Sequence, residues 1–120
     1  MQRRLKAFFD AMRGVFVCLT QEAHGRFHAC AAVVVVLTAF LLDASLDDWC
    51  WFAGCIGAVI ATESINSSIE RLANRVSTEH HDLIRDAKDL AAGAVLVVSV
   101  ASAVIGMMRM YPLVIGTIYP

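Results

Sequence analysis

Three apolar stretches, separated by short polar segments, dominate the pattern of this 120-residue chain. They cover residues 29–42, 49 to about 65, and 90–108, and an extension of the third stretch to Ile115 is left open. The third stretch has the roughly 20 consecutive apolar residues of a transmembrane helix, and the first two are shorter. Because the chain lacks amphipathic partner segments to cover all of these stretches, we expect all three to span a membrane, at about residues 27–43, 48–70 and 87–110.

A different pattern precedes the first apolar stretch. Between about residues 2 and 20, apolar side chains recur at spacings of three and four: Leu5, Phe8, Phe9, Met12, Val15, Phe16 and Leu19. This periodicity predicts an amphipathic helix that lies in the headgroup plane of the membrane. Gly25 follows this segment, and we expect the chain to bend there before it enters the first span.

The composition supports a membrane protein of one domain, residues 1–120. The chain is 58% hydrophobic and 18% charged, whereas soluble domains are about 45–50% apolar. A chain this short buries too little of its surface to hide such a composition, so lipid must take the place of a core. The expected fold class is an all-α membrane protein with three transmembrane helices and one N-terminal surface helix.

The distribution of charge predicts how the chain crosses the membrane. Basic residues lie before the first span and between the second and third: Arg3, Arg4, Lys6, Arg13, Arg26, Arg71, Arg75, Arg85 and Lys88. The segment between the first and second spans carries three aspartates and no Lys or Arg. Since basic loops stay in the cytoplasm, we expect a cytoplasmic N-terminus and an external C-terminus. The net charge of −1 and the absence of a nucleic-acid-binding motif give no indication of nucleic acid.

The most informative polar residues lie at the end of the second span. In a helix, Glu63, Asn66 and Glu70 fall within about 60° of one another, and Asn74 extends the same face. Ionisable groups at membrane depth cost at least a few kcal/mol each, so they usually mark a functional site. The alternative is that the helix has already left the lipid at Glu63 and that these residues form a solvated face.

Further charged residues are expected at the same cytoplasmic interface. Glu22 lies at the end of the surface helix, and Lys88 and Asp89 lie at the start of the third span. Alone, a Lys–Asp pair there is ordinary helix capping. Several carboxylates with one lysine, however, suit Mg²⁺ and phosphate oxygens. The chain has no Walker A loop and no protein-kinase motif.

These motifs resemble the signature of the prokaryotic diacylglycerol kinase and undecaprenol kinase family. The matching segments are E-S-I-N-S-S-I-E at residues 63–70, A-K-D-L-A-A-G at residues 87–93, and E-x-x-x-R at residues 22–26. The resemblance is collinear over roughly residues 3–110. It implies a homotrimer in the bacterial cytoplasmic (inner) membrane, with active sites between subunits at the cytoplasmic face.

The resemblance also implies roles for individual residues. Glu63 would be the general base for the lipid hydroxyl, and Asn66 would orient the catalytic cluster. Glu22 and Glu70 would bind Mg²⁺ on the ATP phosphates. The implied ATP-binding residues are Arg3, Glu22, Glu70, Glu79, His81, Lys88 and Asp89. The implied contacts to the lipid substrate are Arg3, Glu63 and Arg26.

The sequence departs from the family pattern at three positions. Asp10 stands where the family usually has Tyr, Phe9 where many members have Arg, and Asn74 where many have Asp. The first two departures affect expected contacts on the surface helix, and the third weakens the acidic face.

The lipid acceptor and the activity itself both have alternatives. R-F-H at residues 26–28 and the A-K-D-L-A-A-G run favour undecaprenol, whereas E-H-H-D-L at residues 79–83 favours diacylglycerol. A non-catalytic alternative is a membrane scaffold subunit or a proton path lined by the glutamates.

Overall fold

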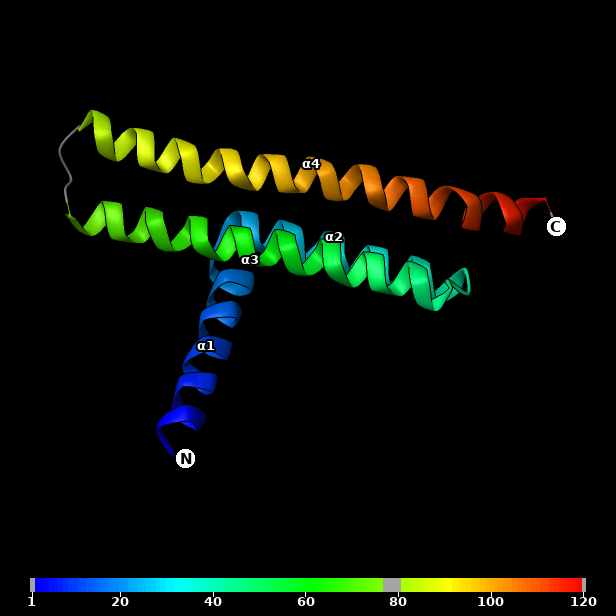
Figure 1. The fold of residues 1–120 in the computed structure, drawn as a ribbon, viewed down its shortest axis with the longest axis horizontal. Coiled ribbons are helices and arrows are strands. Elements are labelled where there is room, and N and C mark those ends of the chain that lie inside the picture. The colour runs from blue at the N-terminus through cyan, green and yellow to red at the C-terminus, as the bar shows by residue number, and fades with distance from the viewer. Residues whose placement is uncertain (1, 77–80, 120) are drawn as a thin grey trace.

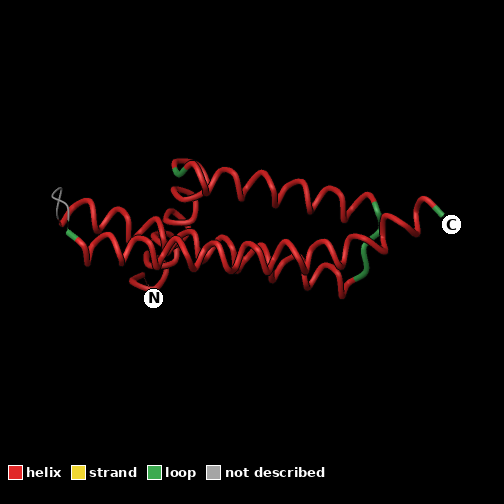
Figure 2. Tube along the Cα trace, turned by 90° about the horizontal axis from the view of Figure 1, so that it is seen from above, coloured by secondary structure: helices red, strands yellow, loops and turns green. Residues whose placement is uncertain are grey.

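The computed structural model describes residues 2–76 and 81–119, and helices account for nearly all of them (Figure 1). The elements are α1 (Gln2–Gln21), α2 (Ala23–Leu41), α3 (Leu46–Val76) and α4 (Asp82–Ile118), and no strand occurs among the described residues. Helices α3 and α4 lie antiparallel and side by side, and α2 packs against α3. Figure 2 shows α2 displaced to one side of the plane that contains α3 and α4. The expected all-α architecture is confirmed.

The lengths of α2, α3 and α4 confirm three helices that are long and apolar enough to cross a membrane. The 19 residues of α2 measure about 28 Å, close to the hydrocarbon thickness of a bilayer. With 31 and 37 residues, α3 and α4 extend beyond that thickness. Helix α4 continues past the expected end at residue 110 and through Pro112. The polar ends of these two helices therefore project from the apolar layer.

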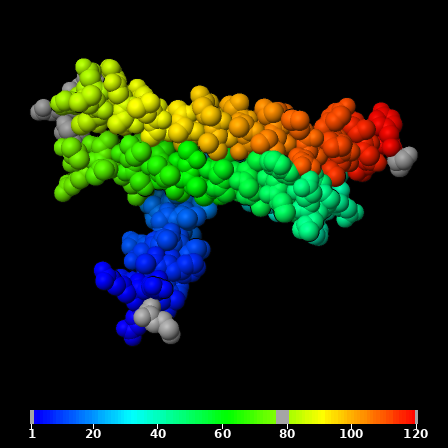
Figure 3. Space-filling view, in the orientation of Figure 1, coloured from blue at the N-terminus to red at the C-terminus, as the bar shows by residue number. Residues whose placement is uncertain are grey.

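Most large apolar side chains in this chain face outward. In the described residues, the buried apolar side chains are Cys18, Ala39 and Phe52, and α4 buries none of its residues. The space-filling view shows α1 projecting from the slab formed by the other helices (Figure 3). Its phenylalanines at positions 8, 9 and 16 are about 60% exposed. Such exposure suits contact with lipid, as the composition predicted.

The chain turns between α1 and α2 at Glu22, which has an extended backbone with ψ 136°. The expectation of a bend at Gly25 is wrong, because Gly25 is a buried residue inside α2. A Cβ atom at Gly25 would lie 2.0 Å from the backbone oxygen of Cys18 in α1. Glycine is therefore required here for the close approach of two helices.

An acidic end of the bundle, where α2 meets α3, is held by a helix cap and an arginine. Ser45 and Asp48 form reciprocal hydrogen bonds: the Ser45 hydroxyl donates to Asp48 Oδ2 at 2.6 Å, and Asp48 N donates to Ser45 Oγ at 3.2 Å. Arg109 of α4 contacts Asp47 at 2.6 Å and Asp48 at 3.4 Å, and it lies over the Trp51 ring. These contacts join α4 to the start of α3.

Candidate active site

The polar segment of α3 contains two kinds of residue. Thr62, Ser64 and Ser68 each donate their hydroxyl to the carbonyl four residues earlier, at 2.7–2.8 Å. The hydroxyl donors of these side chains are therefore paired within their own helix, as is common for Ser and Thr in apolar surroundings. In contrast, the side chains of Glu63 and Asn66 are strongly polar and are buried at 2% and 5% exposure. The helix thus carries two strongly polar groups that need other partners.

Asn66 is the centre of the face that the sequence predicted. Its Nδ2 donates to Glu70 Oε1 at 3.3 Å. Its Oδ1 is buried and has no hydrogen-bond partner among the described residues. A buried unpaired acceptor costs about 1–3 kcal/mol, so this oxygen is suited to a donor or a cation supplied by a ligand.

Glu22 is brought to α3 by an ion pair with Arg71. Arg71 Nε and Nη2 donate to Glu22 Oε1 at 2.9 Å and 2.5 Å. Glu63, in turn, interacts electrostatically with both Glu22 and Glu70. The structure therefore brings together the three carboxylates that the sequence expected at one interface.

Lys88 reaches the same end of α3 from α4. Its Nζ donates to Asn74 Oδ1 at 3.3 Å. The departure from the family pattern at Asn74 thus places a neutral acceptor opposite the lysine. Asp89, the neighbour of Lys88, is exposed, and so is Arg26 in the first turn of α2, whose backbone N–H donates to Glu22 O at 3.0 Å.

Arg3 and His81, two further predicted site residues, have no described contact with this cluster in one chain. Arg3 is exposed near the free end of α1, which points away from α3 and α4 (Figure 1). The rise of an α-helix places it about 28 Å along α1 from Glu22. His81 is exposed at the start of α4, and Glu79 lies outside the described residues. The roles predicted for these three residues stay predictions.

The donor chemistry of the cluster fits a hard divalent cation, although the present side-chain placement does not form a finished cage. Three carboxylates and the unpaired Asn66 oxygen are the oxygen ligands that Mg²⁺ prefers. In the described part of the chain, no three His, Cys, Asp or Glu side chains are already placed to bind a metal. Arg71 holds one of the required groups, Glu22. A cation that takes Glu22 must therefore compete with Arg71.

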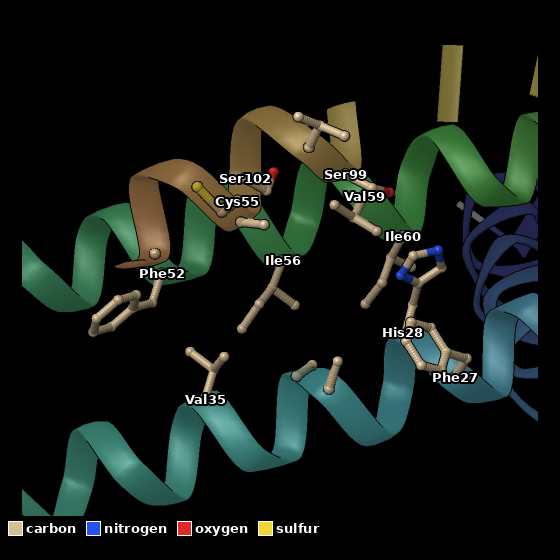
Figure 4. A pocket seen from close by; sticks show the side chains of 15 residues that line it. Phe27, His28, Val35, Phe52, Cys55, Ile56, Val59, Ile60, Ser99 and Ser102 are labelled. Atoms are coloured by element: carbon tan, nitrogen blue, oxygen red, sulfur yellow. The ribbon is translucent and has the colours of Figure 1, made fainter. Parts of the chain in front are cut away.

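An apolar cavity of about 460 Å³ lies between α2, α3 and α4 (Figure 4). Val35, Phe52 and Ile56 are among its apolar lining residues, and the polar side chains in its wall are His28, Ser99 and Ser102. Ile60, another lining residue, is one helical turn before Glu63. The cavity therefore lies among the apolar parts of the three helices, and Ile60 brings its wall to within one helical turn of the buried Glu63.

His24 and His28 were not singled out from the sequence as site residues. Both interact electrostatically with Glu63, and His28 also lines the cavity. Their spacing of four residues places them on one side of α2. The spacing of the two histidines at the start of an apolar span could have marked them as candidates. Only the packing of α2 against α3, however, shows that they lie near Glu63.

Comparison with known proteins agrees with the motifs and the fold. Residues 10–110 match the profile of the family described as prokaryotic diacylglycerol kinase. Undecaprenol kinase of Bacillus subtilis (strain 168) is 36% identical over 112 residues, which cover 93% of this chain and 91% of that protein. Diacylglycerol kinase of Pseudomonas aeruginosa is 36% identical over 95 residues, with 78% and 76% covered.

A second diacylglycerol kinase, from Escherichia coli (strain K12), is 28% identical over 102 residues, covering 85% of this chain and 84% of that protein. The family match includes the face of α3, the start of α4 and Glu22 at the α1–α2 junction. The chain therefore belongs to the prokaryotic diacylglycerol kinase family, and it is a membrane-embedded lipid kinase.

Proposed function

We propose that this lipid kinase transfers the γ-phosphoryl group of ATP to undecaprenol, giving undecaprenyl phosphate and ADP. The observation that carries the proposal is the burial of Glu63, at 2% exposure, near Glu22 and Glu70 and one helical turn from the cavity residue Ile60. Undecaprenol is favoured because the undecaprenol kinase of Bacillus subtilis aligns with 93% of this chain. The alternative acceptor is diacylglycerol, whose phosphorylation gives phosphatidic acid.

Each step of the transfer can be assigned to a group of this chain. Glu63 accepts the proton of the lipid hydroxyl while that oxygen forms a bond to the γ-phosphorus. The bond between this phosphorus and the bridging oxygen breaks, and ADP leaves. Asn66 orients Glu70 through its amide, and Lys88 neutralises charge on the phosphates.

Mg²⁺, held by Glu22 and Glu70, would supply charge neutralisation on the ATP oxygens. The unpaired Asn66 oxygen and the anionic character of the cluster support this assignment. Arg3, Arg26, His81 and Asp89 remain candidate substrate contacts, as does Glu79.

The acceptor would enter from the membrane with its chain in the apolar cavity. Burial of hydrocarbon against this lining is favourable, and it leaves the hydroxyl at the end beside Glu63. ATP would arrive from the opposite direction, at the projecting ends of α3 and α4 that carry Arg71 and Lys88. We propose that these ends face the cytoplasm of a bacterial cell, that the membrane is the inner membrane, and that a homotrimer with sites between subunits is the active form.

The deciding experiment measures phosphate transfer from labelled ATP to extracted lipid in mixed micelles with Mg²⁺. Undecaprenol and diacylglycerol are supplied separately and in competition, and we expect undecaprenyl phosphate to be the main product. A main product of phosphatidic acid would reverse the choice of acceptor. No lipid product from either acceptor would refute kinase activity and support the proton-path or scaffold alternative.

Glu63→Gln tests the base directly, because it keeps the shape of the side chain and removes its charge. We expect turnover to fall at least 100-fold, the usual range for a general base, while a non-hydrolysable ATP analogue still binds. Asp48→Asn is the matched control, since Asp48 is also a buried carboxylate of α3 but lies at the opposite end of the helix. Near-normal turnover of Glu63→Gln would exclude Glu63 as the base.

A further inference from the structure

Arg71 has no role in the reaction described so far, although it lies within the proposed site. It follows Glu70 directly on α3, and its guanidinium donates twice to Glu22 Oε1. The Arg71 side chain is 54% exposed, and the Glu22 side chain is 27% exposed. Arg71 is thus an accessible cation that is paired with Glu22, the carboxylate that the proposed reaction uses to bind Mg²⁺.

The ion pair between Arg71 and Glu22 is easily exchanged. Pairs between exposed side chains contribute little to stability, because water and salt screen their attraction and the side chains lose mobility. A divalent cation on Glu22 would carry twice the charge of the guanidinium. It would neutralise the carboxylate and so weaken its attraction for Arg71. Binding of metal and nucleotide would therefore release Arg71 close to the phosphates.

The charges around the site favour a second cation on the nucleotide. Glu22, Glu63 and Glu70 contribute negative charge that would repel the polyphosphate of ATP. Lys88 opposes them from α4, where its partner is the neutral Asn74. Arg71 lies three residues before Asn74, so Arg71 and Lys88 are at the same end of α3.

Arginine is also the side chain best suited to this task. Its planar guanidinium presents donors that match two phosphate oxygens at once, and it remains charged at every relevant pH. A role limited to joining the α1–α2 junction to α3 would need no contact with the nucleotide. A phosphate-binding role and a purely structural role of Arg71 therefore predict different effects of its removal on nucleotide affinity.

We propose, on the basis of the lipid kinase mechanism above, that Arg71 exchanges partners during nucleotide binding. Without nucleotide it occupies Glu22, and with Mg²⁺ and ATP bound it leaves Glu22 and binds the phosphates. Arg71 is then both a phosphate-binding residue and a competitor that keeps the metal from binding Glu22 in the absence of nucleotide.

Calorimetric titration of the full chain in detergent, with Mg²⁺ and a non-hydrolysable ATP analogue, tests the phosphate contact. We expect Arg71→Ala and Arg71→Gln to weaken binding about tenfold or more, because each loses a charged hydrogen-bond donor. Arg71→Gln keeps most of the side chain and serves if Arg71→Ala does not fold. Arg75→Ala, an exposed arginine one turn further along α3, should change the affinity less than about twofold. Equal affinity of the wild type and both Arg71 variants would overturn the proposal.

Binding of Mn²⁺ without nucleotide, measured by electron paramagnetic resonance, tests the competition for Glu22. Arg71→Ala should bind Mn²⁺ several-fold more tightly than the wild type, and adding Glu22→Gln should abolish this gain. Unchanged or weaker Mn²⁺ binding by Arg71→Ala would overturn the proposed exchange of partners at Glu22. Failure of the wild type itself to bind the analogue would instead refute the proposed kinase function on which this inference depends.

Discussion

Replacement of Gly25 by alanine should disturb both the fold and the active site, because Gly25 lies at the crossing of α1 and α2. The added Cβ would lie 2.0 Å from the Cys18 oxygen and 2.8 Å from the Cys18 carbonyl carbon. Both atoms belong to the backbone, so no side-chain rotation relieves the overlap. An approach of at least 3.0 Å is needed, and the two helices must therefore separate by about 1 Å.

This displacement has an expected cost for stability and for turnover. Overpacking in well-packed regions costs about 1–3 kcal/mol, and alanine regains up to about 1 kcal/mol through its better helix propensity. We therefore expect a net loss of about 1–2 kcal/mol. Since Glu22 lies between the two helices, a shift of about 1 Å should also reduce turnover by up to about 100-fold.

Thermal unfolding in detergent and the lipid phosphorylation assay measure these two effects. Gly116→Ala is the matched control, because a Cβ at Gly116 meets no described atom within 4 Å. The double variant Cys18→Ala, Gly25→Ala should not be rescued, since the obstructing atoms are backbone atoms. Wild-type stability and turnover in Gly25→Ala would refute the close approach of the two helices.

Three further predictions concern the acidic end and the cavity. Ser45→Ala removes the cap of α3 and should lower the free energy of unfolding by about 0.5–2 kcal/mol, measured by denaturant titration; an unchanged unfolding midpoint would contradict the cap. Arg109→Met leaves Asp48 without its cation and should lower the unfolding midpoint in the same titration, whereas an unchanged midpoint would show that the pair contributes nothing to stability. Ile56→Trp fills the cavity and should raise KM for the lipid acceptor at unchanged nucleotide affinity. Val36→Trp, on the exposed side of α2, is its control, and an equal KM in both variants would exclude the cavity as the lipid site.

Hydropathy and helical geometry were sufficient to predict the spans and the polar face of α3. Apolar stretches locate helices in lipid because each backbone polar group must be satisfied within its own segment. The shared face of Glu63, Asn66 and Glu70 then follows from 3.6 residues per turn, and on this face Asn66 Nδ2 donates to Glu70 Oε1. These are local properties, and local properties can be read from a sequence.

Contacts between helices could not be predicted in the same way. Glu22 and Arg71 are 49 residues apart, and no periodicity specifies which faces of α1, α2 and α3 meet. The third span was expected to end at about residue 110, whereas α4 continues to Ile118, and its Arg109 contacts Asp48 of α3. The sequence predicted a bend at Gly25, because the close approach of the Cys18 backbone has no signature in the sequence.

Polar contacts near both ends of the α3–α4 pair set the length of this hairpin. Lys88 meets Asn74 near the connecting segment, and Arg109 meets Asp47 and Asp48 at the other end, about 39 Å away along α3. A deletion of one turn from either helix alone would break one of the contacts. Equal deletions from both would keep the two contacts and shorten the hairpin. Relatives adapted to thinner membranes should therefore lose residues from α3 and α4 together, and those adapted to thicker membranes should gain residues in both. A change of length confined to one helix should be rare.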